Sequence, residues 1–332
     1  MYGFYVGCDV SKATLDVAYA VDGQPVYLGQ FDNDSIGFIR MTEELKSVTT
    51  ESVDSWFILF ENTGLYSKAL LEWLNSNEIS CREEGSNFIA RATTMKRGKS
   101  DRLDAELICK YLYQLRDSIK PSKLANPLIV KLKHLLSRRD FLARQIRSLR
   151  GSTKKKLLVL EPQIFEMMSS QDGEVILLLQ KQIRDTDKLI EETLLQDSQM
   201  HKNYSLIQSV IGIGPVIAAY IIAFTDNFSA FSSARKFASY CGTAPILHYQ
   251  SGIKRGRRRV SQKANKKIKS LLTMGARAAR VHDPEIRLYF ERKIGEGKEP
   301  GVVFNNVKNK LIQRAFATVK RQSSYVKLMS YA

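Results

Sequence analysis

Residues 4–10 read FYVGCDV, residues 14–21 read TLDVAYAV and residues 56–60 read WFILF, and these segments set the architecture of the N-terminal part. The first is expected to be a strand, and the second alternates in polarity, as strands do. Asp22-Gly23 is a turn signal and residues 25–31 predict a third strand, so the first three strands form an antiparallel meander. The continuously apolar run at 56–60 is typical of a strand buried on both faces.

Helical segments and one further strand complete this pattern. Residues 36–45, 65–74 and 102–115 predict helices, and residues 78–83 predict a strand. Three strands, a helix and then alternating strands and helices predict a mixed sheet with helices packed on it. An α/β domain is therefore expected over residues 1–120.

The middle of the chain, residues 121–200, carries two heptad-like series of apolar residues. They are Leu128, Leu132, Leu135, Leu142, Ile146 and Leu149, and then Ile176, Leu179, Ile183, Thr186 and Ile190. Arg139 occupies one position of the first series. This spacing predicts two long helices that form an antiparallel pair or an intermolecular coiled coil. Gly151 and residues 171–173 are expected to break the helices.

The C-terminal part, residues 201–332, predicts a mostly helical domain. Residues 206–224 have apolar helical spacing on both sides of Gly212-Ile213-Gly214, an arrangement that resembles a helix-hairpin-helix. Glycines there would let backbone amides at a helix N-terminus approach a phosphate. A plain helical hairpin that packs for stability is the alternative.

Charge is distributed unevenly along the chain. The 332 residues include 51 Lys+Arg and 34 Asp+Glu, a net charge of +17. The first 60 residues contain three basic and nine acidic residues, whereas residues 251–280 contain eleven basic and no acidic ones. Residues 131–156 form a second block, with ten basic residues and Asp140 as the only acidic one. A solvated face is the simpler reading of such a block, but this pattern favours binding to nucleic-acid phosphates.

Several classes of protein are disfavoured. The longest apolar stretch, residues 210–224, is shorter than the ~20 residues that span a bilayer, so no membrane partner is expected. The N-terminus has no basic segment followed by an apolar one, which argues against secretion. Four scattered cysteines and four histidines show no metal-ligand or disulfide spacing. A cytoplasmic protein is expected.

Four carboxylates are candidates for a metal site. Asp9 lies at the end of the first predicted strand, Glu61 follows the apolar strand, and Asp101 and Asp104 open a helix one turn apart. Such residues can converge at one edge of a sheet, and all-oxygen sites suit Mg²⁺ or Mn²⁺. Taken singly, Asp9 could cap a turn, Glu61 could be a surface residue and Asp101 could be an N-cap. Jointly, the order Asp, Glu, Asp-x-x-Asp resembles RuvC Holliday-junction resolvases, which have a ribonuclease H-like fold.

Longer motifs resemble one family. VGCDVSK, ENTGLY and KSDRLDA surround the four carboxylates, and SVIGIGPVIAAYI and then FASYCGTAPILHYQSGIKRGRRRVSQKANKKIKSLL follow in the second half. These motifs resemble the DEDD-type transposases of the insertion-sequence-110 family and the related Piv-type DNA invertases. The resemblance implies that Asp9, Glu61, Asp101 and Asp104 bind divalent metal, expected to be Mg²⁺ in a site that can hold two ions. It also implies that Ser251 is a nucleophile that forms a covalent link to DNA.

Partners and phosphate contacts follow from the resemblance and from the basic blocks. Known members use a noncoding guide RNA that pairs with donor and target DNA, and they assemble as homo-oligomers (dimers or tetramers). The candidate nucleic-acid-binding residues are Arg138, Arg139, Arg144, Arg147, Lys154, Lys155, Lys156, Gly212, Gly214, Lys254, Arg255, Arg257, Arg258, Arg259, Lys263, Lys266 and Lys267.

The leading hypothesis is a transposase that mobilises an insertion sequence by metal-dependent, serine-linked strand exchange, guided by a bridge RNA. A Piv-type site-specific invertase shares the same expected active site. A RuvC-like endonuclease without a covalent intermediate is the competing class, and a non-enzymatic nucleic-acid-binding protein with a decayed site is the third. The joint presence of the four carboxylates and Ser251 disfavours the last.

Overall fold

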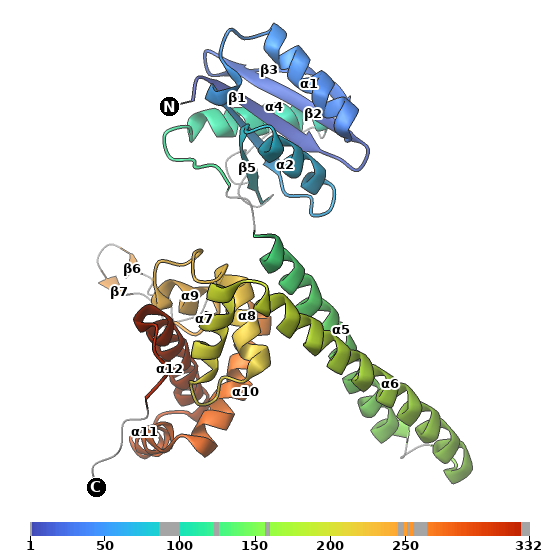
Figure 1. The fold of residues 1–332 in the computed structure, drawn as a ribbon, viewed down its shortest axis with the longest axis vertical. Coiled ribbons are helices and arrows are strands. Elements are labelled where there is room, and N and C mark those ends of the chain that lie inside the picture. Colours follow the sequence, from blue (N-terminus) through green and yellow to red (C-terminus); the bar gives the residue numbers. More distant parts are fainter. Residues whose placement is uncertain are drawn as a thin grey trace. The chain divides into compact units, whose positions relative to one another are not determined.

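The chain contains two compact units, residues 1–124 and residues 125–332 (Figure 1). The computed structural model describes residues 2–85, 100–122, 126–156, 160–244, 249–250, 253–254 and 264–326. The long helices expected as a middle region make their contacts within the second unit.

A five-stranded mixed sheet forms the centre of the first unit. Its strands are β1 (Phe4–Val10), β2 (Thr14–Val21), β3 (Gln24–Asp32), β4 (Trp56–Glu61) and β5 (Ser80–Glu84). The order across the sheet is β3-β2-β1-β4-β5, with β1, β2 and β3 antiparallel and β1, β4 and β5 parallel. The predicted meander and mixed sheet are confirmed, and this topology is consistent with a ribonuclease H-like fold.

Helices cover both faces of this sheet (Figure 1). They are α1 (Ser35–Ser47), α2 (Ser67–Ser76) and α4 (Asp101–Gln114), and a short 3₁₀ helix, Val53–Ser55, precedes β4. Because side chains alternate along a strand, Ile58 of β4 packs in one core with α1 and α2, while Phe57 and Leu59 pack in another with Ile108 and Leu112 of α4.

Gly7 brings α4 unusually close to the central strand. A Cβ built on Gly7 would lie 2.2 Å from the backbone nitrogen of Cys109, 2.6 Å from its Cα and 2.8 Å from the carbonyl oxygen of Ala105. All three atoms belong to the α4 backbone, so only glycine permits this contact. The residues at the start of α4 are thereby held next to β1.

Two long helices begin the second unit. The helices α5 (Pro127–Lys156) and α6 (Pro162–Leu195) pack side by side, and Leu132, Leu142 and Ile190 of the heptad series are buried (Figure 1). The predicted breaks are wrong, because α5 runs through Gly151 and α6 runs through residues 171–173. A glycine costs a helix only about 1 kcal/mol relative to alanine, which packing along a long helix offsets.

A helical body follows. Its helices are α7 (Ser198–Gln208), α8 (Pro215–Thr225), α9 (Ala234–Tyr240), α10 (Lys266–His282), α11 (Pro284–Gly295) and α12 (Pro300–Arg321), and two short strands, β6 (Tyr249–Gln250) and β7 (Ile253–Lys254), pair with each other. Residues 217–223 of α8 are all buried, so this apolar segment is the central helix of the core. Within the described part of the chain, no helix combines the length and apolarity needed to cross a membrane.

All four cysteines are buried and carry free thiols. Cys8 and Cys81 lie in the core under α1 and α2, Cys109 lies on α4, and Cys241 lies in the core of the second unit. Burial raises the pKa of Cys81 to about 11 and that of Cys109 and Cys241 to about 12. These thiols therefore stay protonated and behave as small apolar side chains.

Candidate active site

Three carboxylates converge where β1 ends and α4 begins. One oxygen each from Asp9, Asp101 and Asp104 lies within 4.8 Å of the other two. Asp9 and Asp104 are partly buried and Asp101 is exposed, so solvent reaches the cluster from one side. Among the described residues this is the one group of three or more potential ligands close enough to share a metal ion.

The local sequence explains this convergence. Asp9 alternates with Gly7 and Tyr5 on the face of β1 that α4 covers. The N-cap of α4 is Ser100, whose Oγ accepts a hydrogen bond from the Leu103 amide at 3.3 Å, so the N-cap role considered for Asp101 belongs to its neighbour. Negative charge in the first turn is favoured by the helix dipole, which partly offsets repulsion between the carboxylates.

Glu61 lies on the same face of the sheet but outside the tight cluster. It ends β4, directly after Phe60, which pairs with Cys8 in the parallel ladder. It alternates with Phe57 and Leu59, and both pack against α4. Its charge contributes to the electrostatics of Asp9. The structure thus brings three of the four predicted ligands together and places the fourth beside them.

Asp9 is the electrostatic centre of the site. Burial raises its pKa to about 6, and the nearby charges of Asp104, Asp101, Glu61 and Asp16 act in the same direction. A divalent cation bound here would relieve both the repulsion and the cost of desolvation. The donors are carboxylate oxygens only, which fits Mg²⁺ or Mn²⁺ rather than a metal that prefers nitrogen or sulfur.

Asp16 is a fifth acidic residue that the sequence patterns did not single out. It pairs with Asp9 across β1 and β2 and is only 4% exposed. Its two oxygens accept hydrogen bonds from the Tyr27 hydroxyl at 2.6 Å and from Gln30 Nε2 at 2.9 Å. Asp16 therefore adds charge beside Asp9 while its own oxygens are occupied. An aspartate inside an alternating strand next to Asp9 was the signal available in the sequence.

Tyr27 also connects Asp16 to the start of α4. The Arg102 guanidinium lies over the Tyr27 ring, 4.9 Å from its centroid. Burial and the hydrogen bond to Asp16 raise the Tyr27 pKa to about 12, so its hydroxyl remains a donor. Because Arg102 lies between Asp101 and Asp104 in sequence, this stack ties the acidic turn of α4 to β3.

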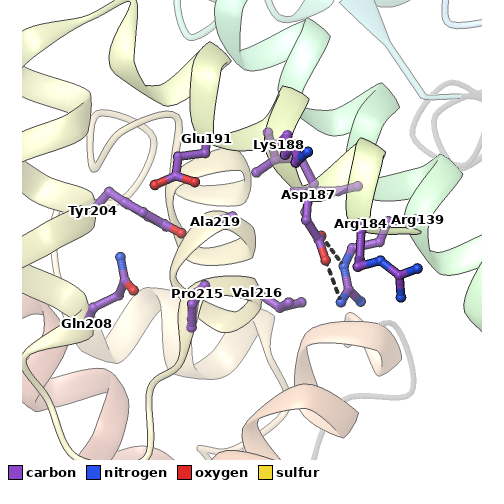
Figure 2. A pocket seen from close by; sticks show the side chains of 12 residues that line it. Arg139, Arg184, Asp187, Lys188, Glu191, Tyr204, Gln208, Pro215, Val216 and Ala219 are labelled. Carbon is purple, nitrogen blue, oxygen red and sulfur yellow. Dashed lines mark hydrogen bonds and ion pairs between the residues drawn. The ribbon is translucent and has the colours of Figure 1, made fainter. Parts of the chain in front are cut away.

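Arg139, a predicted phosphate contact, is engaged within the protein. Its guanidinium donates to the two carboxylate oxygens of Asp187 on α6, at 2.6 and 3.2 Å (Figure 2). The pair borders a cavity of about 530 Å³ that α5, α6, α7 and α8 enclose. Arg184, Lys188 and Glu191 also line it, so the cavity has mixed charge. The ion pair fits the heptad position of Arg139, because it joins the two long helices.

The other predicted nucleic-acid contacts on α5 and α10 differ in whether their side chains are exposed or engaged with other residues of the protein. Arg138 is exposed and stacks on Phe141, Arg147 is exposed, and Arg144 lies 4.0 Å from Asp140. Lys266 is exposed, whereas Lys267 forms an ion pair with Asp140.

The two glycines before α8 differ from each other. Gly212 has a φ of +97°, and a Cβ built there would lie 2.6 Å from the carbonyl oxygen of Gly275 on α10. It thus serves close helix packing, as in the plain-hairpin alternative. Gly214, the N-cap of α8, has open space around it.

The remaining predicted residues lie outside the described part of the chain. They are Ser251, Arg255, Arg257, Arg258, Arg259 and Lys263, together with the side chains of Lys154, Lys155, Lys156 and Lys254.

Comparison with known proteins identifies relatives over most of the chain. Residues 6–162 match a family model of IS110-type DEDD transposases, and residues 204–291 match the model described as "Transposase IS116/IS110/IS902 family". The first match contains all four predicted metal ligands.

Individual relatives, two of them matching over nearly the full length of this chain, are consistent with these family matches. A pilin gene-inverting protein from Moraxella lacunata is 24% identical over 97% of this chain and 98% of its own length, and a protein of the same name from Moraxella bovis matches equally. A protein of insertion element IS116 from Streptomyces clavuligerus is 32% identical over 37% of this chain and 29% of its own length. With an acidic cluster of the kind that a DEDD domain needs for a divalent metal, the chain belongs to the IS110/IS116 family of transposases, enzymes of DNA recombination that cleave and rejoin DNA.

Proposed function

We propose that this protein mobilises an insertion sequence by metal-dependent, serine-linked DNA strand exchange. The observation that carries the proposal is the convergence of Asp9, Asp101 and Asp104 at the edge of the mixed sheet, with Glu61 beside them. These four residues would hold the divalent ion, Mg²⁺ or a pair of Mg²⁺ ions. Bound there, it supplies stabilisation of the charge that develops on the attacking and leaving oxygens.

Ser251 is the proposed nucleophile. Its Oγ would attack a DNA phosphorus atom, forming a phosphoserine bond as the bond from phosphorus to a sugar oxygen breaks and the sugar leaves with its hydroxyl. The hydroxyl proton of serine must be removed, because a neutral serine is a weak nucleophile. The number of phosphodiester bonds is conserved, so the strands can be rejoined without ATP. Support comes from the QSG motif beside the basic block and from the family membership.

A test for the serine uses end-labelled cognate DNA with Mg²⁺. Wild-type protein is expected to form a protein–DNA adduct that survives denaturant, and Ser251→Ala is expected to form none, because it lacks the attacking oxygen. Ser270→Ala, which removes an exposed hydroxyl on α10, serves as the matched control and should form the adduct normally. Cleavage without an adduct, unchanged in Ser251→Ala, would instead identify a RuvC-like nuclease that uses water.

A noncoding guide RNA is the proposed source of target choice. Two separate basic blocks, at 131–156 and 251–280, supply positive charge for contacts with both RNA and DNA backbones. We expect a discrete RNA encoded beside the gene to copurify with the protein, and nuclease treatment to abolish strand exchange. Full activity after RNA removal would show direct DNA recognition and would exclude a guide.

Self-association is part of the proposal. Val175, Leu178 and Leu189 are each close to half exposed. They lie along one stripe of α6, since Leu178 follows Val175 by three residues and Leu189 follows Leu178 by eleven, which is a step of three and two steps of four. Such a stripe supports the packing of a second copy against the long helices.

Site-specific inversion is the second candidate function. The full-length matches to the two Moraxella pilin gene-inverting proteins favour it. The same site would serve both reactions, and the DNA product distinguishes them: an excised or inserted element for transposition, and a reversed segment for inversion.

A further inference from the structure

Three neighbouring helices in the second unit carry basic residues and no acidic ones. The helices α9 and α10 both pack on α12. They contain two, five and five lysine or arginine residues respectively, and none contains aspartate or glutamate. Any cation that points between these helices must find its counter-charge elsewhere.

Lys308 is one of the basic residues of α12, and it is buried. Its side chain is only 7% exposed, and among the described residues it has neither a hydrogen bond nor an ion pair. The charged group that acts on it is another lysine, Lys269 of α10. Burial and this like charge lower the pKa of Lys308 from its usual value. A largely buried lysine beside a second cation is costly unless an anion joins them.

Two partly buried cations of the same unit are paired. Arg314, also on α12, donates to Asp283 at 2.6 Å and to Glu285 at 2.7 Å. Lys267 is paired with Asp140. Lys308 is more buried than either of these two residues, and among the described residues it has no such partner.

The turn that follows α9 lies beside Lys269 and beside the part of α12 that precedes Lys308. Asn305, one helical turn before Lys308, donates from Nδ2 to the carbonyl oxygen of Thr243 at 2.6 Å. A Cβ built on Gly242 would lie 3.8 Å from Lys269 Nζ. The two lysines thus belong to different helices that both contact this turn, and the charge of Lys269 acts on Lys308.

We propose that Lys269 and Lys308 form a binding site for a phosphodiester group of a nucleic-acid backbone. The site rests on the proposed function for the identity of its ligand. A phosphate between the two lysines supplies the negative charge that the surrounding helices lack. DNA and RNA present the same group, so both are tested.

The test measures binding of a labelled DNA duplex of random sequence, and separately of a labelled RNA hairpin, by fluorescence anisotropy at several salt concentrations. Lys308→Met is expected to weaken binding roughly tenfold and to reduce the slope of log K against log salt by about 0.9 on the duplex, as for one lost phosphate contact. Its Tm should equal or exceed that of the wild type, because an unpaired buried charge is removed. Lys320→Met, an exposed lysine on the same helix, is the matched control.

Lys269→Met provides a second variant, because Lys269 is partly exposed and its replacement disturbs the core less. It should weaken binding in the same direction and raise the Tm by relieving Lys308. The ligand whose salt slope falls, DNA or RNA, identifies the backbone that the site holds. Affinity and slope unchanged for both ligands, or a lowered Tm in Lys308→Met, would refute the site. Adduct formation is scored independently, so a wild type that binds through these lysines but forms no adduct would refute only the recombinase proposal.

Discussion

Asp9→Asn is expected to abolish DNA strand cleavage and to stabilise the metal-free protein. Asparagine removes one anionic ligand from the cluster of three, and metal catalysis of this kind contributes several kcal/mol of charge stabilisation. At about 1.4 kcal/mol per factor of ten, cleavage should fall about a thousandfold or more. Binding of DNA should be retained, because the basic blocks lie elsewhere in the chain. Asp104→Asn should behave likewise in cleavage.

The gain in stability follows from the raised pKa of Asp9. Its pKa is about 6 in the folded protein and 3.8 ordinarily, so the folded state holds the proton more tightly than the unfolded state does. The fold therefore loses stability as the pH rises from about 4 through 6, and the loss is complete at pH 7. Because Asp9 is partly exposed, solvent screening reduces it to about 1–2 kcal/mol. Asparagine cannot ionise and avoids this cost.

Thermal unfolding without metal tests the predicted gain in stability of Asp9→Asn. The Tm of Asp9→Asn should exceed that of the wild type at pH 7, and the difference should vanish below about pH 4. Added Mg²⁺ should raise the Tm of the wild type much more than that of the variant. Asp54→Asn, an exposed aspartate of the same unit, is the control and should change neither cleavage nor Tm. Full cleavage by Asp9→Asn would remove this residue from the metal site.

Gly7→Ala is expected to disrupt the site without altering any charged residue. The added Cβ would meet the α4 backbone at 2.2–2.8 Å, so the helix must move away from β1. Overpacking of a tight interior costs about 1–3 kcal/mol, and this contact involves backbone that cannot rotate aside. Movement of α4 separates Asp101 and Asp104 from Asp9, so cleavage and the Mg²⁺-dependent rise in Tm should both be lost.

Gly29→Ala is the matched control on β3. A Cβ there meets only the Phe31 ring at 3.7 Å and Glu44 at 3.9 Å, which are ordinary contacts. It should preserve the response of the Tm to Mg²⁺ and the cleavage activity. A Gly7→Ala protein that keeps the metal response would show that the close approach of α4 is not what assembles the site.

The sequence predicted those parts of the fold and site that depend on local pattern. Alternation and apolar runs identified the five strands, and strand ends plus a helix start located Asp9, Glu61, Asp101 and Asp104. The structural roles of the glycines were the hardest to predict from the sequence. At Gly151 the local pattern predicts a break, but α5 continues through it. The role of Gly7 depends on a helix about a hundred residues away in the sequence.

The features that the sequence did not predict depend on contacts between elements that are distant in the sequence. Arg139 was assigned to nucleic acid from its place in a basic block, but Asp187 on the neighbouring helix occupies its guanidinium. The sequence does not predict the burial of Asp16 and Lys308, because single charged residues in amphipathic segments are ordinarily exposed. Their burial follows from the packing of β2 under α4 and of α12 against α10, which no local pattern encodes.

The buried cysteines are built-in probes of local unfolding of the cores that surround them. A thiol reagent attacks only an exposed thiolate, so labelling at neutral pH requires the surrounding core to open first. Cys109 reports on the core that carries the acidic turn of α4, Cys8 and Cys81 on the opposite face of the same sheet, and Cys241 on the helical body. The local stability of each core can therefore be followed separately in the unmodified chain, with and without nucleic acid.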